Sequence, residues 1–337
     1  NLRKKFMGTP EKVVNLFTFI AEEVREILAS LGFKSLNEVV GRTDLLKQIS
    51  RGKSNLDDLD LSPLLVQVDP GEKKRHSEPE LINKVPESLD EKIYNDIKNL
   101  FGKKNNIEKD YKIKNTNRAV GTRLSHYIYK EKSNKVFITI NLFGSAGQSL
   151  GAFGIKGLKL NIIGDANDYV GKGLSGATIV IKPPKESNLI SHENTIIGNT
   201  VLYGATSGNL FASGQSGERF AVRNSGAEAV IEGCDSNGCE YMTGGCVVIL
   251  GKVGDNFGAG MTGGMAFVYD PNQEFDNYAN PGSIVWQEPE TEYWKNYLKN
   301  LITQHFKETE SKIASRLIEN FNNEVKKFQQ ICPKEML

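Results

Sequence analysis

Several kinds of residue and segment are scarce in this 337-residue sequence, and each scarcity excludes a class of protein. No stretch approaches the roughly 20 apolar residues that a membrane-spanning helix needs. No secretory signal peptide is visible either. Lysine and arginine together number 42 against 41 acidic residues, so the net charge of +1 gives no bulk attraction to nucleic acid or to an anionic membrane. We therefore expect a cytoplasmic protein with neither nucleic acid nor membrane as a partner.

Cysteine and histidine are also scarce, at four residues each. So few thiols indicate a reducing compartment rather than a disulfide framework; they are Cys234, Cys239, Cys246 and Cys332. The C-x4-C-x6-C spacing of the first three matches neither the usual zinc nor the usual iron–sulfur pattern. We interpret them as small buried side chains. The histidines share no spacing, so we interpret them as structural or exposed: His76, His126, His192 and His305.

Other residues that could carry chemistry do not form a recognisable set. Residues 144–147, Gly-Ser-Ala-Gly, lack the G-x-S-x-G pattern of a nucleophile turn. Asp165, Asp168 and Asp235 could in principle hold a cation. The run Asp-Ala-Asn-Asp at residues 165–168 is more typical of side chains that shape a tight turn. We therefore assign no catalytic, cofactor-binding or metal-binding residue in this chain, and we predict a scaffold.

Glycine, in contrast, is abundant at 33 residues, and it recurs in phase. A glycine followed by a short β-rich run returns at intervals of 19, 32, 18, 18 and 19 residues, beginning at Gly157, Gly176, Gly208, Gly226, Gly244 and Gly263. The long interval contains a polar insertion of about 14 residues, which a solenoid tolerates on one face. A period near 18 is too short for helical repeats or propeller blades and is typical of one coil of a parallel β-helix. We predict a mainly β fold, a right-handed, single-stranded parallel β-helix over residues 119–270.

The repeat also bears on two apparent nucleotide motifs. Residues 171–176 and 258–263 both match G-x-G-x-x-G. That fingerprint indicates dinucleotide binding only when its glycines follow a strand and open a helix. Here each motif precedes a strand-like run at the same phase of the repeat, which favours corner glycines. A nucleotide-binding enzyme remains an alternative that binding of NAD or FMN at residues 171–176 would support.

Helices are predicted on both sides of the repeat. Thr9 and Pro10 suit the start of an amphipathic helix over residues 9–31 with one buried face. A capping box at residues 88–91 starts a short helix inside an otherwise polar stretch. The predicted divisions are a helical segment at residues 1–49, an extended connector at 50–118, the β-helix, and a C-terminal helical cap at 271–337 with its helices within 291–328.

Long motifs inside the repeat resemble a known family. Gly217-Glu-Arg-Phe-Ala-Val-Arg-Asn-Ser-Gly226 and similar stretches resemble the C-terminal glycine-motif domain of glutamate synthase large subunits, at residues 143–153, 164–176, 197–206, 217–226 and 239–245. Residues 8–28 and 41–46 are similar to the tail of the flavin-binding synthase domain of that family. The chain begins at Asn1 rather than Met, as a part of a longer protein would.

This resemblance implies an enzyme that transfers the amide nitrogen of glutamine to 2-oxoglutarate and reduces the product to give two glutamates. It implies FMN and a 3Fe-4S cluster in the synthase domain and an N-terminal glutamine amidotransferase, all outside this chain. Cys234, Cys239 and Cys246 do not match the family's C-x5-C-x4-C spacing, so none is carried over as a cluster ligand. No cofactor is expected on this fragment, whose β-helix would be a spacer between the two catalytic domains.

The resemblance also implies partners. These are the rest of the large subunit and either a small NADPH-oxidising subunit or ferredoxin. Plastid stroma is then an alternative to the cytoplasm. A different reading is a stand-alone β-helix scaffold subunit of another oxidoreductase complex. Such a scaffold has no need for the flavin-domain tail at residues 9–46.

Overall fold

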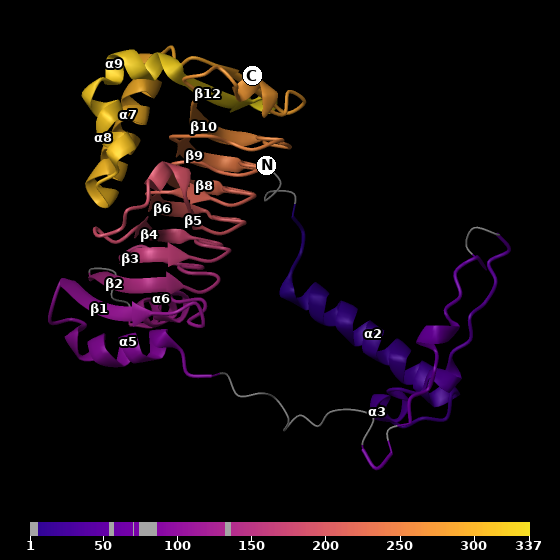
Figure 1. Cartoon of the computed structure of the whole chain (residues 1–337). Coiled ribbons are helices and arrows are strands. Elements are labelled where there is room, and N and C mark those ends of the chain that lie inside the picture. Colours follow the sequence, from indigo (N-terminus) through magenta and orange to yellow (C-terminus); the bar gives the residue numbers. More distant parts are fainter. Residues whose placement is uncertain (1–5, 54–56, 70, 74–85, 132–135) are drawn as a thin grey trace. The chain divides into compact units, whose positions relative to one another are not determined.

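The computed structural model describes residues 6–53, 57–69, 71–73, 86–131 and 136–337 (Figure 1). The chain divides into two compact units, Asn1–Val85 and Pro86–Leu337, which are described separately below. The fold is mixed α/β, with a mostly parallel sheet that contains twelve strands among the described residues, and with flanking helices. Within the same residues, no helix has both the length and the apolar content to cross a membrane.

The first unit is built around one long helix. Helix α2 spans Pro10–Ser30 and is followed by the short helix α3 (Leu36–Val39). As predicted, the Thr9 side chain caps α2 by accepting a hydrogen bond from the Lys12 amide at 3.4 Å. The predicted buried face is wrong for the described structure, because no residue of α2 is buried and Phe17 is 64% exposed. A helix buries an apolar stripe only against a second layer, and the described residues of this unit form no such layer.

The second unit contains the sheet, in the order β1-β2-β3-β4-β6-β8-β9-β10-β12-β11. Neighbouring strands are parallel from β1 to β10. Each predicted glycine-led run forms a strand, and the repeated strands are β2 (Phe137–Ala146), β3 (Leu158–Ala166), β4 (Ser175–Lys182), β6 (Ser207–Ala212), β8 (Ser225–Ile231), β9 (Thr243–Ile249) and β10 (Gly263–Tyr269). The short strands β5 (Thr195–Ile197) and β7 (Gln215–Ser216) pair beside this path.

Apolar side chains at equivalent positions of successive strands stack into ladders. One ladder runs through seven strands, and every member is fully buried: Ile140, Leu160, Ile179, Leu210, Ala229, Val247 and Ala266. Side chains alternate between the two faces of a strand. The next residue of each strand from β4 to β10 therefore points to the opposite face, where it meets a second core.

That second core lies between the outer face of the sheet and two helices. Helices α7 (Glu292–Thr309) and α8 (Lys312–Glu319) bury Leu298, Ile302 and Leu317 against Phe211 and Phe267. The helices lie along one side of the stacked strands in Figure 1. The sheet is consequently buried on both faces from β4 to β10. This explains the near-continuous apolar runs in those strands.

Residues 86–118, which the sequence analysis placed in the connector, form a part of the second unit. Helix α5 (Leu89–Ile97) and strand β1 (Asn106–Ile113) lead into helix α6 (Thr122–Lys130), and β1 pairs with β2 in parallel. Ile93, Ile97, Ile107 and Ile113 all join the main core. The intervening positions of β1 are exposed and charged, so its composition resembles that of a polar connector.

The C-terminal segment contains strands as well as the predicted helices. After α7 and α8, the short helix α9 (Phe321–Glu324) leads into strand β12 (Phe328–Pro333), which pairs antiparallel with both β10 and β11 (Ile284–Gln287). The predicted helical region ends where β12 begins. Because β12 occupies the edge of β10, it covers the backbone groups that the last parallel strand would otherwise expose.

The strain that stacking imposes can be measured with two glycines of one repeat. Gly204 has a φ of +65° and open space around the position of a Cβ atom, whereas at Gly208, with a φ of +107°, a Cβ would lie 2.5 Å from the Ala177 carbonyl oxygen. We expect Gly204→Ala to lower the free energy of unfolding by about 1 kcal/mol, the cost of the left-handed backbone. Gly208→Ala should cost roughly 3 kcal/mol, because the backbone must also move. Urea unfolding of both variants tests this, and equal losses would contradict it.

Candidate functional site

The cysteines are distributed between the two cores. Cys234 and Cys239 belong to the interior core and Cys246 to the outer one, and all four cysteines are free thiols. Burial raises the pKa of Cys234 to about 12, and burial also raises the pKa values of Cys239 and Cys246 above the ordinary thiol value. Among the described residues, no group of three or more His, Cys, Asp or Glu side chains could hold a metal ion.

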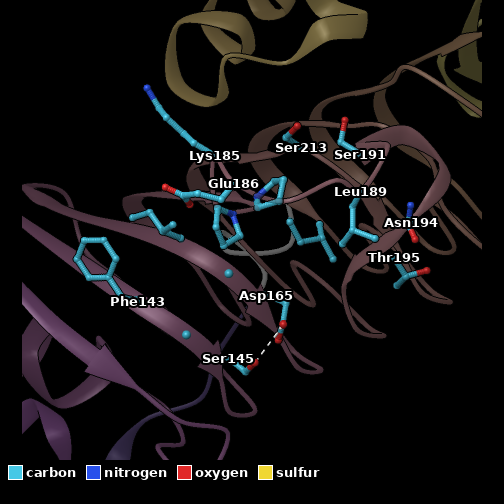
Figure 2. A pocket seen from close by; sticks show the side chains of 16 residues that line it. Phe143, Ser145, Asp165, Lys185, Glu186, Leu189, Ser191, Asn194, Thr195 and Ser213 are labelled. Atoms are coloured by element: carbon cyan, nitrogen blue, oxygen red, sulfur yellow. Dashed lines mark hydrogen bonds between the residues drawn. The ribbon is translucent and has the colours of Figure 1, made fainter.

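The other residues singled out in the sequence are brought together only in part. His76 lies outside the described residues, and His126 and His192 are exposed. Asp168 accepts a hydrogen bond from the Asn199 amide, and Asp235 accepts one from the Ser236 amide, each at 2.8 Å. These two carboxylates therefore hold turns. Asp165 instead accepts from the Ser145 hydroxyl of the neighbouring strand at 3.0 Å (Figure 2).

The two G-x-G-x-x-G motifs lie in turns that precede strands β4 and β10. Gly171 and Gly173 have φ values of +65° and +62°, and Gly258 and Gly260 have +74° and +65°. Neither motif opens a helix, which the dinucleotide fingerprint requires. The glycines are corner residues, as the repeat phase indicates.

The same backbone conformation recurs in every coil, including positions that are not glycine. Three residues at alternate positions have positive φ in six successive turns between residues 149 and 260, for example Arg219, Ala221 and Arg223. The turns also bond to one another: the Ser149 amide donates to the Asp168 carbonyl oxygen, and the Asn237 amide donates to that of Asp255. These hydrogen bonds hold non-glycine residues in the left-handed conformation, which such residues ordinarily avoid. Sequence reasoning missed these positions, because no residue preference marks them.

A cavity of about 770 Å³ lies where β2 and β3 end, beneath the polar insertion (Figure 2). Phe143 of β2 and Leu189 of the insertion contribute apolar surface, and Asp165 and Lys185 contribute charges. Neither a cysteine nor a histidine lines it. Ser145 and Asp165 form a hydroxyl–carboxylate pair in this lining, but no histidine of the lining joins them, so the cavity holds no Ser-His-Asp triad.

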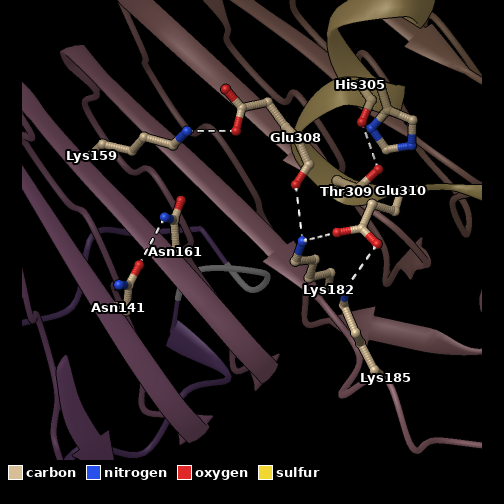
Figure 3. Close-up of polar contacts among 9 residues, drawn as sticks. All are labelled: Asn141, Lys159, Asn161, Lys182, Lys185, His305, Glu308, Thr309 and Glu310. Carbon is tan, nitrogen blue, oxygen red and sulfur yellow. Dashed lines mark hydrogen bonds and ion pairs between the residues drawn. The ribbon is translucent and has the colours of Figure 1, made fainter.

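Ion pairs attach both the sheet and the insertion to the end of helix α7 (Figure 3). Lys159 Nζ lies 2.5 Å from Glu308 Oε2. Lys182 and Lys185 each lie 3.3 Å from a carboxylate oxygen of Glu310. The hydrogen bonds from Lys185 and Lys182 lower the pKa of this exposed carboxyl group. Lys182 Nζ also donates to the Glu308 carbonyl oxygen at 3.3 Å, at the negative end of the helix dipole.

A buried polar cluster lies behind these contacts. Glu232 and His305 are both fully buried. Glu232 Oε1 accepts hydrogen bonds from the hydroxyls of Ser213 at 3.0 Å and Ser311 at 2.5 Å, and His305 Nε2 lies 3.4 Å away. Burial alone would raise the pKa of Glu232, but the hydrogen bonds from His305, Ser191 and Ser311 outweigh it and hold the pKa below its ordinary value. The serines bond to the carboxylate and not to the histidine, so this is not a catalytic triad.

With this geometry described, comparison with known proteins decides the family. A model of the GXGXG motif family matches residues 90–334. The chain belongs to the GXGXG motif family. It is 59% identical to the glutamate synthase (NADPH) large chain of Azospirillum brasilense, 45% to ferredoxin-dependent glutamate synthase 2 of Synechocystis, and 43% to the glutamate synthase (NADPH) large chain of Bacillus subtilis.

The chain matches only a part of each of these relatives. They cover 100%, 98% and 99% of this chain but 22% of each relative. The chain is the GXGXG region of a glutamate synthase large chain, as the motifs in its sequence indicate.

The buried cluster of this GXGXG chain generates a pH prediction. A carboxyl group whose pKa is lowered by folding stabilises the folded state above its ordinary pKa, here 4.5, and this contribution is lost as the pH falls through the lower folded value. Glu232→Gln should reduce the free energy of unfolding at pH 7 by about 2 kcal/mol, because it removes charge-assisted hydrogen bonds. The difference from the unmodified chain should shrink below pH 4.5.

Urea unfolding at pH 7 and in steps below pH 4.5 checks this expectation. Glu186→Gln is the matched control, because Glu186 is an exposed residue of the insertion. It should leave the stability unchanged at every pH. A Glu232→Gln deficit of constant size across the pH range would show that the charge of Glu232 is not responsible.

Proposed function

We propose that this chain is the structural part of a glutamate synthase that transfers the glutamine amide nitrogen to 2-oxoglutarate, with reduction, to yield two glutamates. The observation that carries the proposal is the extent of the similarity. It runs through the whole chain, including the first unit, at 59% identity to a chain named glutamate synthase. The proposed activity belongs to the complete enzyme. This chain spans 22% of the length of that relative.

We further propose that the repeats form a right-handed parallel β-helix that acts as a rigid spacer. The strands repeat in phase, their side chains form continuous ladders, and their turns are bonded from one coil to the next. Parallel strands joined by a crossover are right-handed in nearly all proteins. Such a stack would hold the amidotransferase and synthase domains at a set separation.

The first unit would then belong to a neighbouring domain. Residues 1–49 are proposed to be the tail of the FMN-binding synthase domain, followed by a connector that extends to about residue 85. The exposed apolar residues of α2 support this assignment, since Val14, Phe17 and Phe19 are each more than half exposed. An exposed patch of this kind marks a surface that another layer covers. The β-helix would begin with α5 and β1, and residues 271–337 would close it.

The cofactors of the proposed enzyme are FMN and a 3Fe-4S cluster. The buried cysteines do not fit the cluster, because Cys246 lies in a different core from Cys234 and Cys239 and no three potential ligands among the described residues come together. We assign no residue of this chain to either group, whose binding would fall to the rest of the large chain.

The electron donor of the proposed enzyme is either NADPH or ferredoxin. The identities to the ferredoxin-dependent relative and to the Bacillus subtilis NADPH relative are 45% and 43%, so identity in this region does not sort by donor. We propose a separate NADPH-oxidising subunit as the partner, with ferredoxin as the alternative. The proposed location is the bacterial cytoplasm, with plastid stroma as its alternative.

A second candidate function is a stand-alone scaffold subunit of another oxidoreductase complex. The regularity of the stacked strands would serve it equally well. The similarity of the first unit to glutamate synthases favours the first proposal, because a separate scaffold would not need that unit.

The spacer role can be tested by removing one coil from the complete large chain. Residues 138–157 make one repeat, since Ile138 pairs with Leu158, and the strands on either side can pair in register after the deletion. The deletion leaves α7, α8 and their ion pairs in place and shortens the stack by about 4.8 Å, one strand spacing. We expect glutamine hydrolysis to persist while glutamate formed per glutamine hydrolysed falls at least fivefold.

A matched control replaces residues 138–157 with a second copy of residues 158–176, the repeat by which Lys159 pairs with Thr178, which keeps the number of coils. It should retain coupling if length is what matters. Full coupling in the deleted enzyme, with the loss of a coil confirmed by mass and by a cooperative melting transition, would overturn the spacer proposal.

A further inference from the structure

A second cavity, of about 280 Å³, lies between the first turns of α7 and the outer face of strands β8 to β10. It is separate from the cavity beneath the insertion and shares no lining residue with it. Three aromatic side chains of α7 form one side: Tyr293, Trp294 and Tyr297. Glu228 of β8 contributes the acidic group.

The three rings form an aromatic corner. The Trp294 ring lies at 76° to both tyrosine rings, with centroid distances of 5.0 Å to Tyr293 and 5.7 Å to Tyr297. The two tyrosine rings are more nearly parallel, at 28° and 6.1 Å. The faces of aromatic rings carry negative charge density and attract cations. Rings set at right angles can therefore contact one cation from more than one side.

Glu228 adds a formal charge that no basic side chain balances. It is half-buried, and its hydrogen-bond partner is the Tyr297 hydroxyl. No lysine, arginine or histidine of the described residues forms an ion pair with it. Burial and the bond to Glu228 raise the pKa of Tyr297, so this hydroxyl remains neutral. The carboxylate of Glu228 is therefore the charged group of the cavity.

The floor of the cavity is free of side chains for a structural reason. Gly226, Gly245 and Gly264 lie on consecutive strands and line it. A Cβ atom on Gly226 would lie 2.1 Å from the Thr206 carbonyl oxygen, and one on Gly245 would lie 2.3 Å from that of Ala227. The close spacing of the coils excludes side chains here. As a consequence, space remains in front of the three rings.

We propose that this cavity binds an organic cation that donates hydrogen bonds, an alkylguanidinium or alkylammonium group, held between Glu228 and the rings of Tyr293, Trp294 and Tyr297. A guanidinium group suits it best, because its plane stacks on aromatic faces while its N–H groups bond to a carboxylate. The group has two possible sources, a free small molecule such as arginine or the side chain of a bound polypeptide.

The two tryptophans of the chain provide a direct probe. In the 15N-labelled 337-residue chain, Trp286 and Trp294 give two indole N–H signals, and Trp286→Phe assigns them. Trp286 donates its indole N–H to Asp276, away from the cavity lining, and serves as an internal control. Titration with methylguanidinium should shift the Trp294 signal in a saturable manner and leave that of Trp286 in place. Methylurea, its neutral counterpart of similar shape, should shift neither.

Two variants test the role of the charge. Glu228→Gln keeps an acceptor for Tyr297 but should weaken methylguanidinium binding at least tenfold. Tyr203→Ala, which removes a ring from another coil, should leave binding unchanged. The absence of a saturable shift, an equal response to methylurea, or undiminished binding by Glu228→Gln would each overturn the proposal.

A last arm identifies the source of the cation. A capped Gly-Arg-Gly peptide and free arginine are titrated under the same conditions. At least tenfold tighter binding of the peptide supports a polypeptide side chain as the occupant. Equal or tighter binding of free arginine supports a small molecule.

Discussion

Hydrogen bonding between successive repeats, through the turns as well as the strands, is the constraint on which the second unit depends. It brings one repeat so close to the next that a Cβ atom on Gly164 would lie 2.1 Å from the Gly144 carbonyl oxygen. It also holds residues such as Arg219 and Arg223 in a left-handed conformation. The density of glycine and the unusual backbone of the turns are therefore two consequences of one spacing. The same spacing requires the glycines that line the cavity beside α7.

Two cores share the sheet and divide its surface into distinct environments. The interior ladders close the coil, and the outer rows pack under α7 and α8 from β4 onward. Polar groups lie both at the end of that helical layer and inside it. Lys159 pairs with Glu308 at the end of α7, and the buried Glu232 lies beside His305 beneath the helix. The cavity of about 280 Å³ lies between α7 and the strands, and the cavity of about 770 Å³ lies between the insertion and the strands. Binding capacity is thus located where the repeat is interrupted or covered, not within the coils.

Much of the repeat could be predicted because its signals are local. The phase of the glycines located the parallel strands and the insertion, and the phase also assigned residues 171–176 and 258–263 to corners. Strands β1 and β12 were not predicted as strands. Each carries polar residues on one face and gains its pairing only from a distant strand, so its own sequence resembles a connector or a helix end. The non-glycine left-handed positions were missed because bonds from neighbouring coils, and not residue preference, hold them.

The sequence by itself determined the repeat, its period, the caps of α2 and α5, and the family, since each depends on residues close together in the chain. Only the tertiary structure decided which polar groups meet. Glu228 and Tyr297 are 69 residues apart and Glu232 and His305 are 73 apart. No spacing in the chain connects them, because their meeting depends on where α7 packs across the sheet. That position is set by the burial of its apolar side against rows contributed by many separate strands.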